Sequence, residues 1–279
     1  MSGPPGARSA ASVARVPQAD VNGISLYYER WGEGPTLLFV NGSMSTLELT
    51  RPMVDVYASR FDVVAHDQRG LGKTSIPPGP YSMADYAADA LGLLDHLGIE
   101  RCRLVGVSFG GMVAQEIAVT APERIERLAL VCTSPGGEGG PSYPLHTLRD
   151  LDPGERLGVS MRLMDTRFDD AWLADHPGDR MLVEGLSSRS ATPEGTEAAR
   201  GEREQMEARR DHDVWDRLPR ITCPTLVASG RYDGIAPPAN GEAIASRVPA
   251  AELRVYEGGH AFFAQDPAAF PDIVDFLAG

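Results

Sequence analysis

Short apolar runs alternate with longer segments of mixed polarity along most of the chain. The runs have the length of a strand and few polar interruptions, which is typical of strands buried on both faces of a parallel sheet. They are residues 36–40, 61–65, 102–107, 127–132 and 224–229. Other segments carry apolar residues at helical spacing. They predict helices at 47–60, 83–97, 112–120, 239–247 and 268–277.

The two ends of this pattern differ from its middle. Residues 24–29 and 252–256 alternate between polar and apolar, as strands with one exposed face do. Asn22-Gly23 is the signature of a tight hairpin, so two antiparallel strands are expected near the N-terminus. The later alternation of strands and helices predicts an α/β fold. We expect a mostly parallel, eight-stranded-type sheet with helices on both faces.

The periodicity changes over residues 136–220, where no buried strand is expected. Helical pieces are predicted at 154–164, 171–174, 178–186 and 193–218. The last piece is rich in glutamate and arginine, and we interpret its charges as a solvated helix face. The domain prediction is a disordered tail at 1–19, a core formed by 20–135 and 221–279, and a helical insertion at 136–220.

The composition and net charge of the chain indicate which kinds of molecule it binds. Hydrophobic residues make up 42% of the 279-residue chain and charged residues 23%, the balance of an ordinary globular protein with a sizeable core. The formal net charge of −13 argues against nucleic acid and anionic membranes as partners. A small-molecule substrate is the partner expected, and an anionic one would need a local basic patch. The oligomeric state is left open.

The cysteines and the N-terminal segment favour a cytoplasmic protein. Cys102, Cys132 and Cys223 lie far apart and fit no zinc site, so we expect free buried thiols and no metal. Residues 1–19 lack the apolar centre of a signal peptide. No stretch approaches the ~20 apolar residues of a membrane span.

The strand at 102–107 runs into Gly106-Val-Ser108-Phe-Gly110, and a helical pattern follows it. Glycines at these two positions allow a sharp turn, because a Cβ there would clash with the neighbouring strand and helix. The turn lifts the Ser108 hydroxyl out of the sheet at the start of a helix. This arrangement is the nucleophile elbow, G-x-S-x-G.

A serine nucleophile needs a base, and the base needs an orienting group. His260 follows Gly258-Gly259 at the carboxyl end of a strand, where sites assemble in open α/β sheets. Asp233 follows the strand at 224–229, and the order Ser108, Asp233, His260 is the order given for this elbow. The other acid position, after Cys132, offers no carboxylate. We therefore predict Ser108, Asp233 and His260 as catalytic residues.

Two backbone N–H groups are expected to stabilise the oxyanion. One is that of Phe109, directly after the nucleophile. The second is expected in the loop after 36–40, from Ser43 with Met44 as the reserve. Met44, Phe168 and Trp172 are predicted to line the substrate pocket, because apolar residues of the insertion and of this loop would face the site.

The stretch Gly70-Leu-Gly72-Lys73-Thr74 resembles part of a phosphate-binding loop. That motif requires glycine five residues before Gly72, where this chain has Asp67. Proline-rich loop sequence follows, rather than a helix. Nucleotide binding is therefore excluded, and no cofactor is expected.

Together these motifs resemble those of the α/β-hydrolase superfamily, from about residue 20 to the end. The matching segments are Gly106-Val-Ser108-Phe-Gly110-Gly111, Asp67-Gln-Arg69-Gly70-Leu-Gly72, Gly230-Arg-Tyr-Asp233 with Pro237, and Gly258-Gly-His260. The resemblance implies a Ser–His–Asp hydrolase with 136–220 as a helical cap. The superfamily usually has His-Gly in the oxyanion loop, where this chain has Asn41-Gly42. The loop 41–46 is similar to that of 3-oxoadipate enol-lactonases.

The predicted function is cofactor-free hydrolysis of a small carboxylic ester or lactone through an acyl-enzyme on Ser108. One alternative on the same triad is a C–C bond hydrolase or a perhydrolase. Another is a non-hydrolytic protein that binds or cyclises a ligand on the same scaffold. Aspartate-nucleophile chemistry, as in dehalogenases and epoxide hydrolases, is disfavoured by the serine at position 108.

Overall fold

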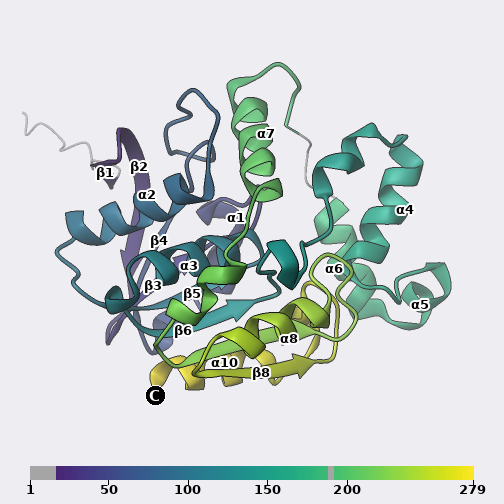
Figure 1. Cartoon of the computed structure of the whole chain (residues 1–279). Coiled ribbons are helices and arrows are strands. Elements are labelled where there is room, and N and C mark those ends of the chain that lie inside the picture. Colours follow the sequence, from purple (N-terminus) through teal and green to yellow (C-terminus); the bar gives the residue numbers. More distant parts are fainter. Residues whose placement is uncertain (1–16, 188–191) are drawn as a thin grey trace, which may run out of the picture.

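One eight-stranded sheet runs through the computed structural model of the chain, which describes residues 17–187 and 192–279 (Figure 1). The strand order is β1-β2-β4-β3-β5-β6-β7-β8. The strands are β1 (Gln18–Val21), β2 (Ile24–Trp31), β3 (Thr36–Val40), β4 (Asp62–His66), β5 (Cys102–Val107), β6 (Ile125–Val131), β7 (Thr225–Gly230) and β8 (Ala251–Tyr256).

The pairing of the strands makes the sheet mostly parallel. β1 pairs antiparallel with β2, and β2 pairs antiparallel with β4, while every pair from β4 through β3 to β8 is parallel. The predicted fold class is confirmed. The register aligns Val40 with Gly106 and Val107 with Val131. The carboxyl ends of β3, β5 and β6 therefore meet at one edge of the sheet.

Helices cover both faces because alternate strand residues point to opposite sides. Leu38 belongs to a core that includes residues of α2 (Met83–His96), α3 (Phe109–Thr120) and α8 (Pro238–Arg247). Its neighbour Leu37 belongs to the opposite core, with α1 (Leu47–Val54), α9 (Phe262–Gln265) and α10 (Ala269–Ala278). The elbow helix α3 is buried along most of its length.

Residues 136–220 leave the sheet after β6 and return to it at β7. Their helices are α4 (Pro153–Met164), α5 (Asp170–Asp175), α6 (Pro177–Ser187) and α7 (Glu197–Arg210). Figure 1 shows α4, α5 and α6 grouped at one side of the sheet, with α7 standing apart from them. The 3-10 turns of the chain are η1 (Tyr57–Ser59), η2 (Pro122–Arg124), η3 (Gly137–Gly139), η4 (Leu145–Asp150) and η5 (Trp215–Arg220).

The boundary predictions for the insertion and for the N-terminal tail are wrong. The helix expected at 193–218 is divided into α7 and η5, because Asp213 pairs with Gly136 and the Val214 N–H donates to the Pro135 carbonyl oxygen. The expected tail at 1–19 is too long: Gln18 and Ala19 pair with β2, and Ala19 is fully buried. The rest of that tail, residues 1–16, lies outside the described residues. None of the described helices is both long enough and apolar enough to cross a membrane.

Candidate active site

Ser108 lies in the sharp turn between β5 and α3. Its backbone is strained, with φ 56° and ψ −115°, a region that L-residues rarely occupy. A Cβ on Gly106 would overlap the carbonyl oxygen of Gly110, and a Cβ on Gly110 would overlap that of Val40. The two glycines therefore allow strand and helix to approach closely enough to hold Ser108 in this conformation.

The three predicted catalytic side chains form one hydrogen-bonded chain. His260 Nε2 lies 2.9 Å from Ser108 Oγ, and His260 Nδ1 lies 2.8 Å from Asp233 Oδ2. The other carboxylate oxygen of Asp233 accepts the N–H groups of Ile235 and Ala236 at 2.8 and 2.9 Å. Asp233 is buried, so its carboxylate is fixed in position toward the imidazole.

The electrostatics of this chain favour a protonated imidazole. Burial is the largest single influence and lowers the pKa of His260, but the adjacent Asp233 carboxylate and Cys132 together raise it by more. The pKa of His260 consequently lies well above its ordinary value of 6.5. His260 is thus a stronger base than an isolated imidazole, and its charged form is stabilised by Asp233.

Two N–H groups flank the nucleophile. Phe109 begins α3, and Ser43 follows Gly42, where a Cβ would lie 3.6 Å from Ser108 Cβ. In the described chain neither N–H has a hydrogen-bond partner. The Met44 N–H, the reserve in our prediction, instead donates to Gln205 Oε1 at 2.7 Å. The geometry therefore favours Ser43 over Met44 as the second oxyanion donor.

The segment after β4 holds the Ser43 loop at both ends. Gln68 Nε2 donates to the Asn41 carbonyl oxygen at 2.8 Å, and Asp67 Oδ1 accepts the Leu47 N–H at 2.7 Å. The other Asp67 oxygen accepts the Lys73 N–H at 2.9 Å. This segment thus uses its polar groups to position a loop.

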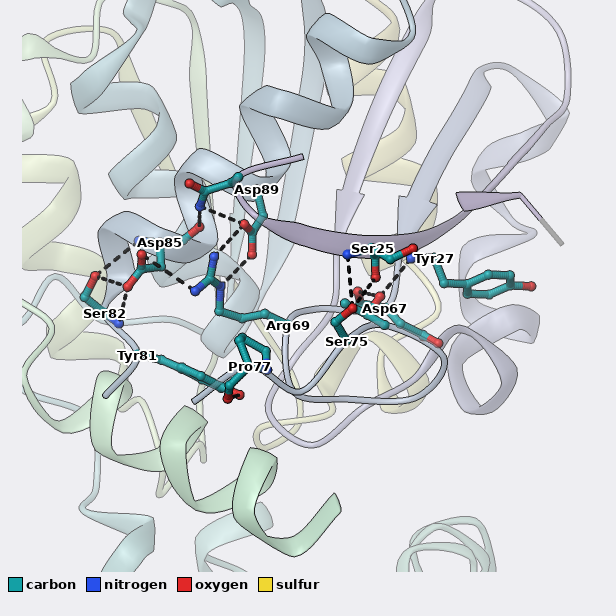
Figure 2. Close-up of polar contacts among 12 residues, drawn as sticks. Ser25, Tyr27, Asp67, Arg69, Ser75, Pro77, Tyr81, Ser82, Asp85 and Asp89 are labelled. Carbon is teal, nitrogen blue, oxygen red and sulfur yellow. Dashed lines mark hydrogen bonds and ion pairs between the residues drawn. The ribbon is translucent and has the colours of Figure 1, made fainter. Parts of the chain in front are cut away.

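Arg69, which follows Gln68 in this segment, binds α2. Figure 2 shows the Arg69 guanidinium directed at Asp89 and Asp85, which lie on successive turns of the helix. Arg69 Nε and Nη2 each lie 2.7 Å from an oxygen of Asp89, and both side chains are buried. Ser82 and Asp85 form a capping box at the start of α2. The pair therefore anchors the segment that supports the oxyanion loop.

Comparison with known proteins decides the family. The model of the alpha/beta hydrolase fold family matches residues 35–267, which is most of the chain. The chain belongs to this family. The 3-oxoadipate enol-lactonase 2 of Acinetobacter baylyi is 29% identical over 255 residues, covering 90% of this chain and 92% of the relative.

Solved structures agree with this assignment. The enol-lactonase from Burkholderia xenovorans LB400 superposes with a TM-score of 0.76 and 26% identity, covering 94% of this chain and 100% of that one. Est816, described as an N-acyl homoserine lactone degrading enzyme, has a TM-score of 0.74 and 25% identity, with 93% and 99% covered. The chain is a hydrolase, and we refer to it as the hydrolase below.

The three residues predicted to line the substrate pocket differ in exposure and in contacts. Met44 is 45% exposed, whereas Phe168 is 1% exposed. Trp172 stacks on His176 and donates from Nε1 to Asp179, so its contacts lie within the insertion. The assignment of Met44, Phe168 and Trp172 to the substrate pocket stays a prediction.

Sequence reasoning missed the buried face of α7. Gln205 is fully buried and Arg209 is 5% exposed, although we interpreted the charges of this segment as a solvated face. The two residues lie one helical turn apart, with the small residues Gly201 and Ala208 on the same buried side. That spacing of small and polar residues is the signal in the sequence that indicates a buried stripe.

Sequence reasoning also missed the part of the insertion that contacts the loops of Asp233 and His260. The His260 N–H donates to the Met164 carbonyl oxygen at 2.6 Å, and the Gly234 N–H donates to that of Leu163 at 3.0 Å. Gln265 Oε1 accepts the Gly259 N–H at 2.8 Å. Most of these contacts are made by the backbone, so a pattern of side chains in the sequence does not predict them.

Proposed function

We propose that the hydrolase cleaves a small carboxylic ester or lactone through an acyl-enzyme formed on Ser108. The observation that carries the proposal is the hydrogen-bonded chain from Ser108 Oγ through His260 to Asp233, with both links shorter than 3.0 Å. A serine hydroxyl becomes an effective nucleophile when a positioned base accepts its proton.

Each residue has one role in this mechanism. Ser108 Oγ attacks the carbonyl carbon while His260 Nε2 accepts its proton, and Asp233 stabilises the imidazolium that forms. The negative oxygen of the tetrahedral intermediate is stabilised by the N–H groups of Ser43 and Phe109, each typically worth about 3 kcal/mol. His260 then protonates the leaving alcohol. A water molecule, activated by the same imidazole, releases the acid from Ser108.

The relatives support esters and lactones as substrates. The names of the A. baylyi relative and of the B. xenovorans structure are those of enol-lactonases, and Est816 is described as degrading a lactone. In a lactone the carbonyl carbon and the leaving oxygen belong to one ring. The same attack therefore opens the ring without releasing a separate alcohol.

Intact-mass measurement after treatment with a fluorophosphonate tests the nucleophile. We expect a single adduct on the wild-type protein and none on Ser108→Ala, because only an activated serine reacts with this reagent. The matched control is Ser246→Ala, which changes an exposed serine and should keep the adduct. Turnover of p-nitrophenyl esters and of lactones of increasing ring size then identifies the substrate class.

Two results would contradict the proposal. One is wild-type protein without an adduct while it hydrolyses an ester. The other is Ser108→Ala with wild-type turnover, since the proposed acyl-enzyme cannot form without the hydroxyl.

A further inference from the structure

Arg209, in the last turn of α7, is a buried cation with most of its hydrogen-bonding capacity unused. Its side chain is 5% exposed, and Nη1 donates to the Tyr143 carbonyl oxygen at 2.8 Å. Nε and Nη2 have no hydrogen-bond partner among the described residues. Burial lowers the pKa of Arg209 to about 10, whereas a neighbouring carboxylate would raise it. Arg209 therefore stays charged at neutral pH without an anionic partner.

The two unused nitrogens form one edge of the guanidinium. Nε–H and Nη2–H point the same way, which is the edge that binds a carboxylate through two parallel hydrogen bonds. An uncompensated buried charge is strongly destabilising, and a bound anion would remove that cost. The orientation of the free edge thus indicates a planar, two-oxygen anion.

A cavity of about 180 Å³ lies against this side chain. Its lining includes Met112, Ser134, Ser142, His146, Arg209 and His212, and no aspartate or glutamate of the described chain lines it. Ser134 Oγ is buried without a partner there and can donate a further hydrogen bond. Burial lowers the pKa of His212 to about 4, so this imidazole is neutral at pH 7. The cavity is a local basic site in a chain of net charge −13.

The cavity is connected to the helix that follows Ser108 and to the loop that carries Asp233. Met112 follows Ser108 by one turn of α3, which is about 6 Å along the helix axis. The Tyr143 carbonyl that accepts Arg209 belongs to a residue whose N–H donates to the Ile235 carbonyl oxygen at 2.7 Å. The Ile235 N–H in turn donates to Asp233 at 2.8 Å. The Arg209 cavity therefore lies between the nucleophile helix and the loop of the catalytic acid.

We infer that the Arg209 cavity binds a carboxylate group of the substrate, so that this hydrolase prefers esters or lactones whose acyl part carries a second, free carboxylate. The inference rests on the proposed function, because it names the substrate class of that same site. The carboxylate pairs with Nε and Nη2 of Arg209 and is close to Ser134 Oγ. The scissile carbonyl lies at Ser108, one turn of α3 before Met112 in the cavity wall.

Binding is tested first, without turnover. The probes are pentanoate and its neutral isostere pentanamide, added to Ser108→Ala and to the wild type at constant ionic strength. We expect pentanoate to raise the melting temperature of both proteins and pentanamide to leave it unchanged. Arg209→Met should lose the response to pentanoate. Equal responses of the wild type to the two probes would overturn the inference, and this comparison needs no folded variant.

Selectivity is tested next, with two esters of similar length. One is the p-nitrophenyl monoester of glutarate, which keeps a free carboxylate, and the other is p-nitrophenyl pentanoate. We expect the ratio of their kcat/KM values to fall roughly 10- to 100-fold in Arg209→Met, as for a lost charged hydrogen bond. Arg209→Lys should give an intermediate ratio. The control Arg203→Met removes an exposed arginine of the same helix and should leave the ratio unchanged.

The outcomes separate this inference from the proposed function. Ester hydrolysis with the same ratio in Arg209→Met and in the wild type would overturn the carboxylate site and leave the serine mechanism standing. Binding of pentanoate without hydrolysis of any ester or lactone would support the site and contradict the mechanism.

Discussion

At the scale of single residues, the proposed mechanism makes the reactivity of Ser108 depend on the protonation of His260. Only the neutral imidazole accepts the serine proton, and Asp233 raises the pKa of His260 above 6.5. We therefore expect kcat/KM for a neutral ester to be low in acid, to rise with pH through that pKa, and to level off above it. A pH–rate profile from pH 5 to 10 measures this, and a plateau already reached below pH 6 would refute it.

Asp233→Asn tests the cause of that shift. The amide oxygen can still accept the N–H groups of Ile235 and Ala236, but the charge that stabilises the imidazolium is lost. Burial then remains as the main influence and lowers the pKa of His260, so the inflection should move to lower pH. The plateau should fall by about 10⁴-fold, because the tautomer is no longer held. An unchanged inflection would show that Asp233 does not set the pKa.

The proximity of Ser108, Asp233 and His260 could be predicted because their signals are local in the sequence. The glycines around Ser108 and the glycine pair before His260 each report a sharp turn beside a strand end. Arg209 and Phe168 could not be placed in the same way. Whether a residue of an insertion is buried depends on how the insertion docks, and helical periodicity alone does not contain that information.

At the scale of elements, the close packing of α3 on β5 should be intolerant of added atoms. A Cβ at Gly106 would overlap the carbonyl oxygen of Gly110, which is backbone and cannot rotate away. We expect Gly106→Ala to lower the free energy of unfolding by about 3 kcal/mol or more, since overpacking here displaces the helix that carries Ser108. Urea denaturation monitored by circular dichroism measures the loss.

The matched control is Gly178→Ala in α6, where an added Cβ meets no atom within 4 Å. Alanine favours a helix more than glycine does, so this variant should be neutral or stabilised by up to about 1 kcal/mol. Equal stability of Gly106→Ala and the wild type would show that α3 can shift away from the strand without cost.

The presence of the core strands and helices could be predicted from the sequence, but the residues at which they end could not. Buried strands such as β3 and β7 are continuous apolar runs, so composition alone identifies them. The helix expected at 47–60 ends at Val54 as α1, and Tyr57–Ser59 forms a separate 3-10 turn. Tyr57 is buried in the core in that position. Tertiary packing, rather than propensity, sets such a boundary.

At the scale of the whole molecule, Gln265 links the insertion to the catalytic loop. Its Oε1 accepts the Gly259 N–H, while Nε2 donates to Asp165 and Asp179 at 3.1 and 3.0 Å. Gln265→Ala leaves the buried Gly259 N–H without its partner, which costs about 1–3 kcal/mol of stability. Asp165 keeps its bonds to Arg167, and Asp179 keeps its bond to Trp172. We expect kcat to fall roughly tenfold with little change in KM, since Gln265 positions His260 and does not contact substrate.

Steady-state kinetics and the pH–rate profile of Gln265→Ala measure that role together. A displaced His260 loses part of its contact with Asp233, so the inflection of the profile should move to lower pH. Gln18→Ala, which truncates an exposed glutamine in β1, is the control and should match the wild type. A purely structural role would lower the melting temperature of Gln265→Ala and leave its inflection unchanged.

The backbone contacts between α4 and the catalytic loops bear on how such an enzyme diverges in evolution. The loops of Asp233 and His260 are held by the carbonyl oxygens of Leu163 and Met164, and not by their side chains. Replacing the side chain of Leu163 or Met164 therefore leaves these two hydrogen bonds in place. The residue type is restricted in the two loops instead, because a Cβ at Gly234 or Gly259 would collide with the backbone of the insertion. A chimera that exchanges residues 136–220 should keep its catalytic geometry if it retains these two glycines and the path of the chain past them.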